Sequence, residues 1–333
     1  MSLAAYKGKP GEKGVALLVV LLLVTVLSTM AIAMTDDIRF AVRRTANLRM
    51  NEQAQWYARG SETLARQVLT RSWKATPDRS TLRDPWAAQG VSFSIDGGSI
   101  TGRINDAGNC FNLNSIVMAG PKGEYLRRDE GRVSYERLLT ALDIPSDIAA
   151  GLAGALIDWI DSNSVPSAQG AEDEAYARRD PSYRTAGALM AEPSELRALA
   201  GYTEELYQRL RPLVCALPTT DPSQINVNTL TEFEAPLLVM VTNGALRGPE
   251  ARRAVAARSE RGYGSVDEFL AQDLFAGLDL EPAARGQLAV RTRYFLAESQ
   301  VRYHEARVIM SSLMEVGSNG VVTTHLRRFG KLD

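Results

Sequence analysis

The chain has 333 residues, in which 38 Lys and Arg balance 39 Asp and Glu to give a formal net charge of −1. This near-neutral charge gives no overall basic field for nucleic acid, and the length accommodates two or three domains. Only two histidines occur, and the sequence has no phosphate-binding loop, H-E-x-x-H, G-x-S-x-G or paired-cysteine zinc pattern. The sequence therefore indicates a protein that is not an enzyme.

An uncharged apolar run, Val15 to Met34, follows a short leader. A helix of about 20 residues spans the ~30 Å hydrocarbon core of a bilayer. A cleaved secretory signal is the alternative, because Ala31-Ile32-Ala33 offers a weak cleavage match. However, apolar and small residues continue at helical spacing after the run, stepping by four from Ile38 to Ala58. We expect one retained helix over residues 15–75, membrane-spanning in its first third and amphipathic after it.

The leader, residues 1–14, contains three lysines and ends in Gly14. Positive charge ahead of an apolar run favours a cytoplasmic location for that end of the chain. Arg39, Arg43 and Arg44 beyond the run weaken this asymmetry, although two aspartates precede them. We expect the N-terminus in the cytoplasm and the rest of the chain across the membrane.

Two blocks with strand-like patterns frame the remainder of the chain. The first, within residues 76–111, contains alternating segments joined by Asp96-Gly97-Gly98, a strong hairpin signal. The second, residues 286–333, contains further strands and a glycine-rich turn. If the blocks pair in one antiparallel sheet, residues 112–285 form a helical insertion; a tandem of independent domains is the alternative. With the N-terminal helix packed on the sheet, the expected fold class is α+β.

The expected insertion contains an internal repeat. Phe111-Asn112-Leu113-Asn114-Ser115 is echoed by Ile225-Asn226-Val227-Asn228-Thr229, and each copy continues into a proline-led helix and a short acidic helix. We expect two similar helical units, over residues 112–218 and 225–285. The second unit is similar to helix–hairpin–helix units of DNA-binding proteins but lacks their G-x-G hairpin. We interpret its arginines as a solvated helix face.

The most specific segment reads Asp158-Trp159-Ile160-Asp161-Ser162-Asn163, followed by Gly170-Ala171-Glu172-Asp173-Glu174-Ala175-Tyr176. With the N-L-N and N-V-N repeats and the Lys13-Gly14-Val15 junction, this order of motifs resembles the K-type minor pseudopilins of type II secretion over essentially the whole chain. Val19 stands where most pseudopilins have a glutamate, and this departure is itself a feature of the K-type subgroup.

The resemblance implies a pilin-like fold with a large helical insertion. It also implies cleavage between Gly14 and Val15 by a prepilin peptidase, with methylation of the new N-terminus. The implied location is the bacterial inner membrane, spanned once, with the C-terminal domain in the periplasm.

The implied function is that of a subunit at the tip of the pseudopilus. There it would join the I- and J-type minor pseudopilins and initiate assembly of the major pseudopilin for export of folded proteins across the outer membrane. A tip subunit needs no glutamate at Val19, because no neighbouring N-terminal amine lies above it. The alternative is a membrane-anchored module that binds DNA or carbohydrate; we expect no nucleic-acid partner.

Cys110 and Cys215 are the only cysteines, and they flank the first helical unit. In the oxidising periplasm we expect them to form a disulfide at the neck of the insertion. Two buried free thiols are the alternative.

The carboxylates of the acidic segment suit calcium, which takes six to eight oxygen ligands. With Asp161 as the first position, Asn163 is third and Glu172 twelfth, but Val165 and Pro166 break the EF-hand pattern. A solvated acidic loop is the alternative. The resembled family includes calcium binders in this domain, so we expect Ca²⁺ with Asp161, Asn163, Glu172 and Asp173 as ligands.

Overall fold

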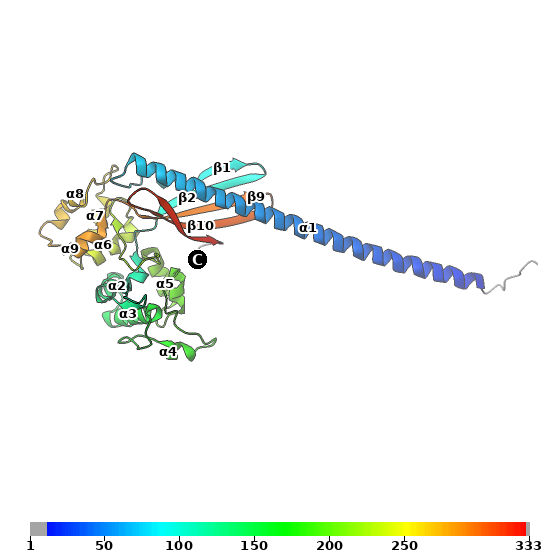
Figure 1. Cartoon of the computed structure of the whole chain (residues 1–333), viewed down its shortest axis with the longest axis horizontal. Coiled ribbons are helices and arrows are strands. Elements are labelled where there is room, and N and C mark those ends of the chain that lie inside the picture. Colours follow the sequence, from blue (N-terminus) through cyan, green and yellow to red (C-terminus); the bar gives the residue numbers. More distant parts are fainter. Residues whose placement is uncertain (1–11, 331–333) are drawn as a thin grey trace, which may run out of the picture.

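A computed structural model describes residues 12–330 and places Glu12–Ala75 in a single helix, α1. At about 1.5 Å per residue, α1 is roughly 95 Å long, and it projects far beyond the rest of the molecule (Figure 1). Side chains from Val15 to Arg49 are exposed, whereas Ala54, Ala58 and Leu69 are buried. The molecule thus consists of a free helical stalk and a folded body.

The amphipathic part of α1 packs on the body only from Met50 onward. Ile38 and Val42, which begin the expected apolar stripe, are 64% and 62% exposed, and packing starts at Met50. The helix overhangs the sheet by several turns, so these side chains have no layer beneath them. Periodicity predicts a face that can pack, but it does not say where the partner layer starts.

A five-stranded antiparallel sheet packs on this part of α1, in the order β1-β2-β9-β10-β11. Strand β2 pairs with β9, from Gly98 opposite Tyr303 to Asp106 opposite Phe295. This pairing joins the two blocks of strands, as expected for one sheet. The strands are β1 (Val91–Ile95), β2 (Gly98–Asp106), β9 (Tyr294–Tyr303), β10 (Ala306–Val316) and β11 (Val322–Phe329).

The β1–β2 turn requires glycine at two positions, as the sequence predicted. Gly97 has a φ of +77°, and a Cβ at Gly98 would overlap the carbonyl oxygen of Arg302 on β9. Only glycine satisfies both positions without strain. The turn therefore fixes the register of the hairpin.

The sheet separates α1 from part of the helical region (Figure 1). On β10, Met310 and Met314 lie in apolar clusters with α1, whereas Leu313 lines a cleft shared with α5 on the opposite face. Helices α2–α5 lie on that opposite side, and α6–α9 lie at the Ala75 end of α1, far from its N-terminus. The α-helices are α2 (Asp129–Ala141), α3 (Ser146–Ile160), α4 (Asp173–Ala177), α5 (Glu204–Leu210), α6 (Ala235–Val241), α7 (Gly248–Ala256), α8 (Val266–Leu270) and α9 (Pro282–Gln287).

Short 3₁₀ helices and short two-stranded β-sheets connect these elements. The 3₁₀ helices are η1 (Pro85–Ala87), η2 (Leu113–Ile116), η3 (Pro193–Ala198), η4 (Arg211–Leu213), η5 (Glu232–Glu234) and η6 (Asp273–Phe275). The remaining strands are β3 (Phe111–Asn112), β4 (Val117–Ala119), β5 (Tyr125–Arg127), β6 (Val214–Cys215), β7 (Ile225–Asn226) and β8 (Leu288–Ala289).

The sequence repeat is also a structural repeat. In each copy the first Asn side chain accepts a hydrogen bond from the backbone two residues on, Asn112 from Asn114 at 3.2 Å and Asn226 from Asn228 at 2.9 Å. Each copy then pairs in parallel with a later segment, β3 with β6 and β7 with β8. The helical region therefore contains two similar units, and in each unit the strand at the Asn motif pairs with a strand later in the chain. The sequence limits of the two units stay a prediction.

Candidate functional site

The described chain contains one stretch long and apolar enough to cross a membrane. It lies in Val15–Ala75, with a mean hydropathy of 2.9 and no burial over its most apolar window. A helix satisfies its own backbone hydrogen bonds in lipid, so this stretch is a candidate membrane anchor. The Gly14–Val15 junction lies inside α1, but the leader residues 1–11 lie outside the described residues, and processing at this junction stays a prediction.

A buried carboxylate fixes α1 to the sheet. Glu62 is 4% exposed and accepts two hydrogen bonds from Arg327, at 2.6 and 2.8 Å, and one each from the Ser312 and Thr324 hydroxyls, at 2.9 and 3.1 Å. The Arg327 hydrogen bonds lower the pKa of Glu62 to about 2, although burial acts in the opposite direction. Glu62 is therefore ionised at neutral pH and links α1 to both β10 and β11.

The expected disulfide is present. Cys110 and Cys215 are bonded where β3 runs parallel to β6, and their Cα atoms are 5.7 Å apart. The bond closes the segment that contains the first Asn motif and helices α2–α5. It therefore staples the neck of the first helical unit.

A second carboxylate, which is half-buried, joins the sheet to the second helical unit. Asp106, at the end of β2, accepts hydrogen bonds from the Thr229 hydroxyl at 2.6 Å, from the Thr292 hydroxyl, and from the Gly108 N–H at 2.7 Å. Burial raises the pKa of Asp106, and the hydrogen bonds from the two threonines counteract this rise. Thr229 belongs to the second Asn motif, so Asp106 fastens that motif to the sheet.

Three carboxylates gather at the C-terminal end of α3. Asp158, Asp161 and Glu172 are 0%, 3% and 6% exposed. The Ser167 N–H donates to both oxygens of Asp158, at 2.9 and 3.1 Å, and Asn163 donates to Asp161 at 2.7 Å. Oε1 of Glu172 is buried and has no hydrogen-bond partner among the described residues. A buried oxygen of this kind is costly unless something else pairs with it.

Burial and mutual repulsion disfavour the ionised forms of these carboxyl groups. Burial raises the pKa of Asp161 to about 6 and that of Glu172 to about 7, and repulsion from Asp158 contributes to both shifts. A hard cation relieves such repulsion and accepts oxygen ligands. In residues 12–330, no three His, Cys, Asp or Glu side chains are already close enough to form a metal shell. A cation at this site would therefore draw the three carboxylates closer together.

The structure divides the predicted calcium ligands into two groups. Asp161 and Glu172 belong to the buried group, and Asn163 lies against it. Asp173 points elsewhere, because its Oδ1 accepts hydrogen bonds from the Thr185 N–H and hydroxyl, both at 2.9 Å. Asp158, which the sequence analysis did not select, is the most buried of the three carboxylates. Its spacing of three residues from Asp161 places both on one helix face, which is the signal that could have identified it.

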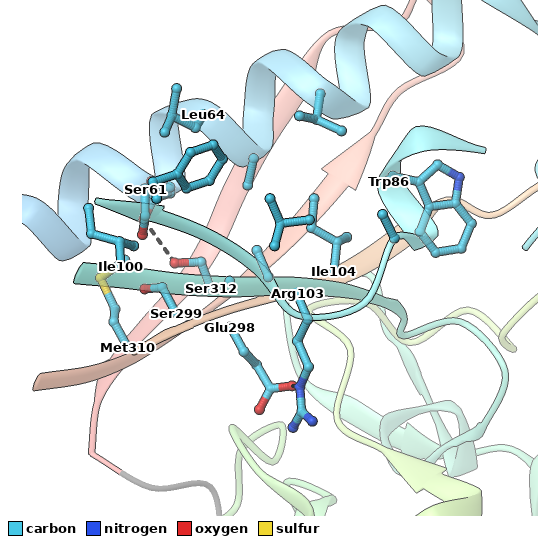
Figure 2. A pocket seen from close by; sticks show the side chains of 18 of the residues that line it. Ser61, Leu64, Trp86, Ile100, Arg103, Ile104, Glu298, Ser299, Met310 and Ser312 are labelled. Carbon is cyan, nitrogen blue, oxygen red and sulfur yellow. Dashed lines mark hydrogen bonds and ion pairs between the residues drawn. The ribbon is translucent and has the colours of Figure 1, made fainter. Parts of the chain in front are cut away.

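An apolar groove lies between α1 and the β1–β2 hairpin (Figure 2). Its cavity volume is about 100 Å³, and Leu64, Val91 and Phe93 on its rim are 44%, 40% and 48% exposed. Ile100 and Ile104 of β2 line its inner side. The sequence analysis did not identify this groove.

Comparison with known proteins identifies the family. Two family models, both described as type II secretion system protein K, match residues 109–219 and 225–291. This chain belongs to the type II secretion system protein K family. Type II secretion system protein K of Pectobacterium carotovorum subsp. carotovorum is 38% identical over 320 residues, covering 96% of this chain and 97% of that protein. The Klebsiella pneumoniae protein is 39% identical over 321 residues, with the same coverage of each chain.

A solved structure of a protein K relative has the same fold. In the crystal structure of the GspK–GspI–GspJ complex from the enterotoxigenic Escherichia coli type 2 secretion system, the similar chain is 31% identical to this one. The TM-score is 0.75, and the match covers 87% of this chain and all of the other. The resemblance to K-type minor pseudopilins and the expected α+β fold are both confirmed. The two family-model matches coincide with the two Asn motifs and their helices.

Proposed function

We propose that this protein is the minor pseudopilin at the tip of a type II secretion pseudopilus. It joins I- and J-type minor pseudopilins and initiates assembly of the major pseudopilin, for export of folded proteins across the outer membrane. The observation that carries this proposal is the length and continuity of α1, which joins an exposed apolar stalk to a body containing a large helical region. The complex of the E. coli relative with GspI and GspJ supports the choice of partners.

A position at the tip accords with where the helical region lies. Helices α6–α9 occupy the Ala75 end of α1, away from the membrane segment (Figure 1). A further subunit stacked beyond that end would have to displace them. Val19 also agrees with a position at the tip of the pseudopilus. A subunit with nothing above it needs no carboxylate there to pair with a neighbour's N-terminal amine.

The proposed location is the inner membrane, with the apolar part of α1 spanning it and the folded body in the periplasm. The disulfide is consistent with an oxidising compartment. A prepilin peptidase would cut before Val15 and leave the apolar helix in the mature chain. The role is structural rather than catalytic.

We further propose that Ca²⁺ binds at the end of α3. Asp158, Asp161 and Glu172 would hold it, with Asn163 or backbone carbonyls completing the oxygen shell. The unpaired Oε1 of Glu172 and the mutual repulsion of the carboxylates support this site. The cation would supply positive charge that orders the segment between α3 and α4; it would have no chemical role.

Co-purification tests the assembly role. The full-length chain should be co-expressed with the I- and J-type minor pseudopilins and purified in mild detergent through a tag on this chain. We expect both partners to be retained, and we expect a strain lacking this protein to form fewer pseudopili. Retention of neither partner would contradict the proposal.

The alternative, a module that binds DNA, finds little support in the second helical unit. Arg258 is half-buried and donates to the carbonyl oxygens of Leu230 and Val227 at 2.6 and 3.3 Å, so it is less available to a phosphate than an exposed arginine. Salt-dependent binding of the purified chain to a DNA duplex would favour the alternative.

A further inference from the structure

The α1-facing side of the sheet is only partly covered. Helix α1 lies mainly over β9 and β10, so the edge strand β1 extends past it on one side (Figure 1). Val91 and Phe93 lie opposite Gly102 and Ile100 of β2, and Ile100 belongs to the buried cluster beneath α1. Val91 and Phe93 therefore face the same side as the core but remain 40% and 48% exposed.

This uncovered strip forms the open side of the apolar groove. Leu64 on α1 and Phe93 on β1 both line this groove. Gly102, which has no side chain, lies between Ile100 and Ile104 on β2 and adds no bulk to the floor; Leu64, Ile100 and Ile104 are labelled in Figure 2. A bulky apolar side chain from another protein would fill this space and remove three exposed apolar residues from water.

The charged residues near the groove are already paired. Glu62 binds Arg327, and Arg103 binds Glu298 at 2.6 Å on the side of the strands away from the groove (Figure 2). Among the described residues that line the groove, no carboxylate or guanidinium is left unpaired. The groove therefore selects an apolar surface.

The height of the groove above the membrane indicates which protein reaches it. Leu64 lies about 45 Å along α1 from Met34, the last residue of the apolar run, at about 1.5 Å per residue. A second subunit that is anchored in the same bilayer by a helix of similar length, running beside α1, would reach this height. A partner without a membrane anchor would not be held beside α1 at this height by the bilayer.

We propose that this groove, formed by Leu64, Val91, Phe93 and the β2 residues beneath them, is the docking surface for an adjacent minor pseudopilin. The neighbour inserts apolar side chains into the groove beside α1. The free edge of β1, which pairs only with β2 among the described strands, allows further backbone contacts. This inference rests on the proposed function and adds the surface through which the partner binds.

Site-specific cross-linking tests this surface in the full-length chain. The photoreactive residue p-benzoylphenylalanine should replace Phe93 in one variant and Phe233 in a matched control, in cells that also express the I- and J-type minor pseudopilins. Phe233 is 87% exposed and lies on η5, in the second helical unit. We expect position 93, but not position 233, to cross-link to a minor pseudopilin identified by mass spectrometry.

A binding measurement completes the test. Phe93→Asp should reduce the minor pseudopilins co-purified with this chain at least tenfold, as for a central contact residue, whereas Phe233→Asp should leave them unchanged. Equal melting temperatures would show that both variants are folded. A cross-link from position 93 to a second copy of this chain, or none while the wild type still co-purifies its partners, would overturn the proposed surface. Failure of the wild type to co-purify any partner would instead overturn the proposed function.

Discussion

Glu62 and Arg327 lie 265 positions apart in the sequence and form a bidentate ion pair, with N–O distances of 2.6 and 2.8 Å, that fixes α1 to the edge strand β11. Apolar contacts alone allow a helix to shift along a sheet, because they lack direction. A bidentate pair between a carboxylate and a guanidinium permits one arrangement. Since α1 also contains the apolar anchor, this pair sets how the folded body is oriented relative to the membrane segment.

Replacing Glu62 with Gln should destabilise the protein by about 2 kcal/mol, a typical value for a hydrogen bond to a charged group. The loss is moderated because Arg327 is 41% exposed and can regain water. Urea unfolding of the full-length chain in detergent measures the change. Glu52→Gln is the matched control, because Glu52 is exposed on the same helix. Equal unfolding midpoints for the two variants would show that the pair contributes little.

The same pair predicts a loss of stability in acid. The pKa of Glu62 in the folded protein is about 2, below its ordinary value of 4.5. The unfolded chain therefore takes up a proton first as the pH falls. The contribution of Glu62 to stability is fully present above about pH 4.5 and is lost as the pH falls towards 2. Thermal melting between pH 5 and 2.5 should show a smaller decline for Glu62→Gln than for the wild type.

Local patterns in the sequence predicted much of the fold. Asp96-Gly97-Gly98 identified the hairpin because turn chemistry depends on neighbouring residues, and the two Asn motifs identified the repeat for the same reason. Glu62 and Asp106 could not be identified in this way. Each is an acidic residue in an ordinary helix or strand, and each becomes a fixing point only through partners such as Arg327 or Thr292, far away in the sequence.

The disulfide should contribute strongly to the stability of the helical region. Cys110 and Cys215 are separated by 105 positions, and closing a loop of this length stabilises by up to about 4–5 kcal/mol in the chain-entropy model. Cys110→Ala with Cys215→Ala should lower the urea midpoint by a large fraction. Thiol labelling of the denatured, unreduced wild type should find no reactive cysteine. Labelling of two cysteines would contradict the bond.

The mature chain should begin at Val15. The apolar helix has to remain attached if it is to anchor and assemble the subunit, so cleavage must precede it. Mass spectrometry of the N-terminal peptide, with and without a prepilin peptidase, measures the position. A new terminus after Ala33 would instead indicate a removed secretory signal and would contradict the retained anchor.

The carboxylates at the end of α3 should make stability depend on both pH and Ca²⁺. The pKa of Glu172 in the folded protein is about 7, above its ordinary value of 4.5, so the unfolded chain loses its proton first as the pH rises. Without Ca²⁺, the stability associated with protonated Glu172 is present below about pH 4.5 and is lost as the pH rises through 7. Bound Ca²⁺ should remove this loss, because it compensates the ionised carboxylates and binds only the folded state.

Glu172→Gln separates this effect from a general effect of salt. An amide keeps the shape of the protonated acid, so at pH 7.5 and without Ca²⁺ this variant should melt at a higher temperature than the wild type and gain less when Ca²⁺ is added. Asp173→Asn is the matched control and should keep the full Ca²⁺ response, because Asp173 is held by Thr185 outside the buried group. Mg²⁺ should substitute poorly, since it requires a tighter octahedron and retains its waters. A wild type whose melting temperature is indifferent to Ca²⁺ at pH 7.5 would show that the three carboxylates form no cation site.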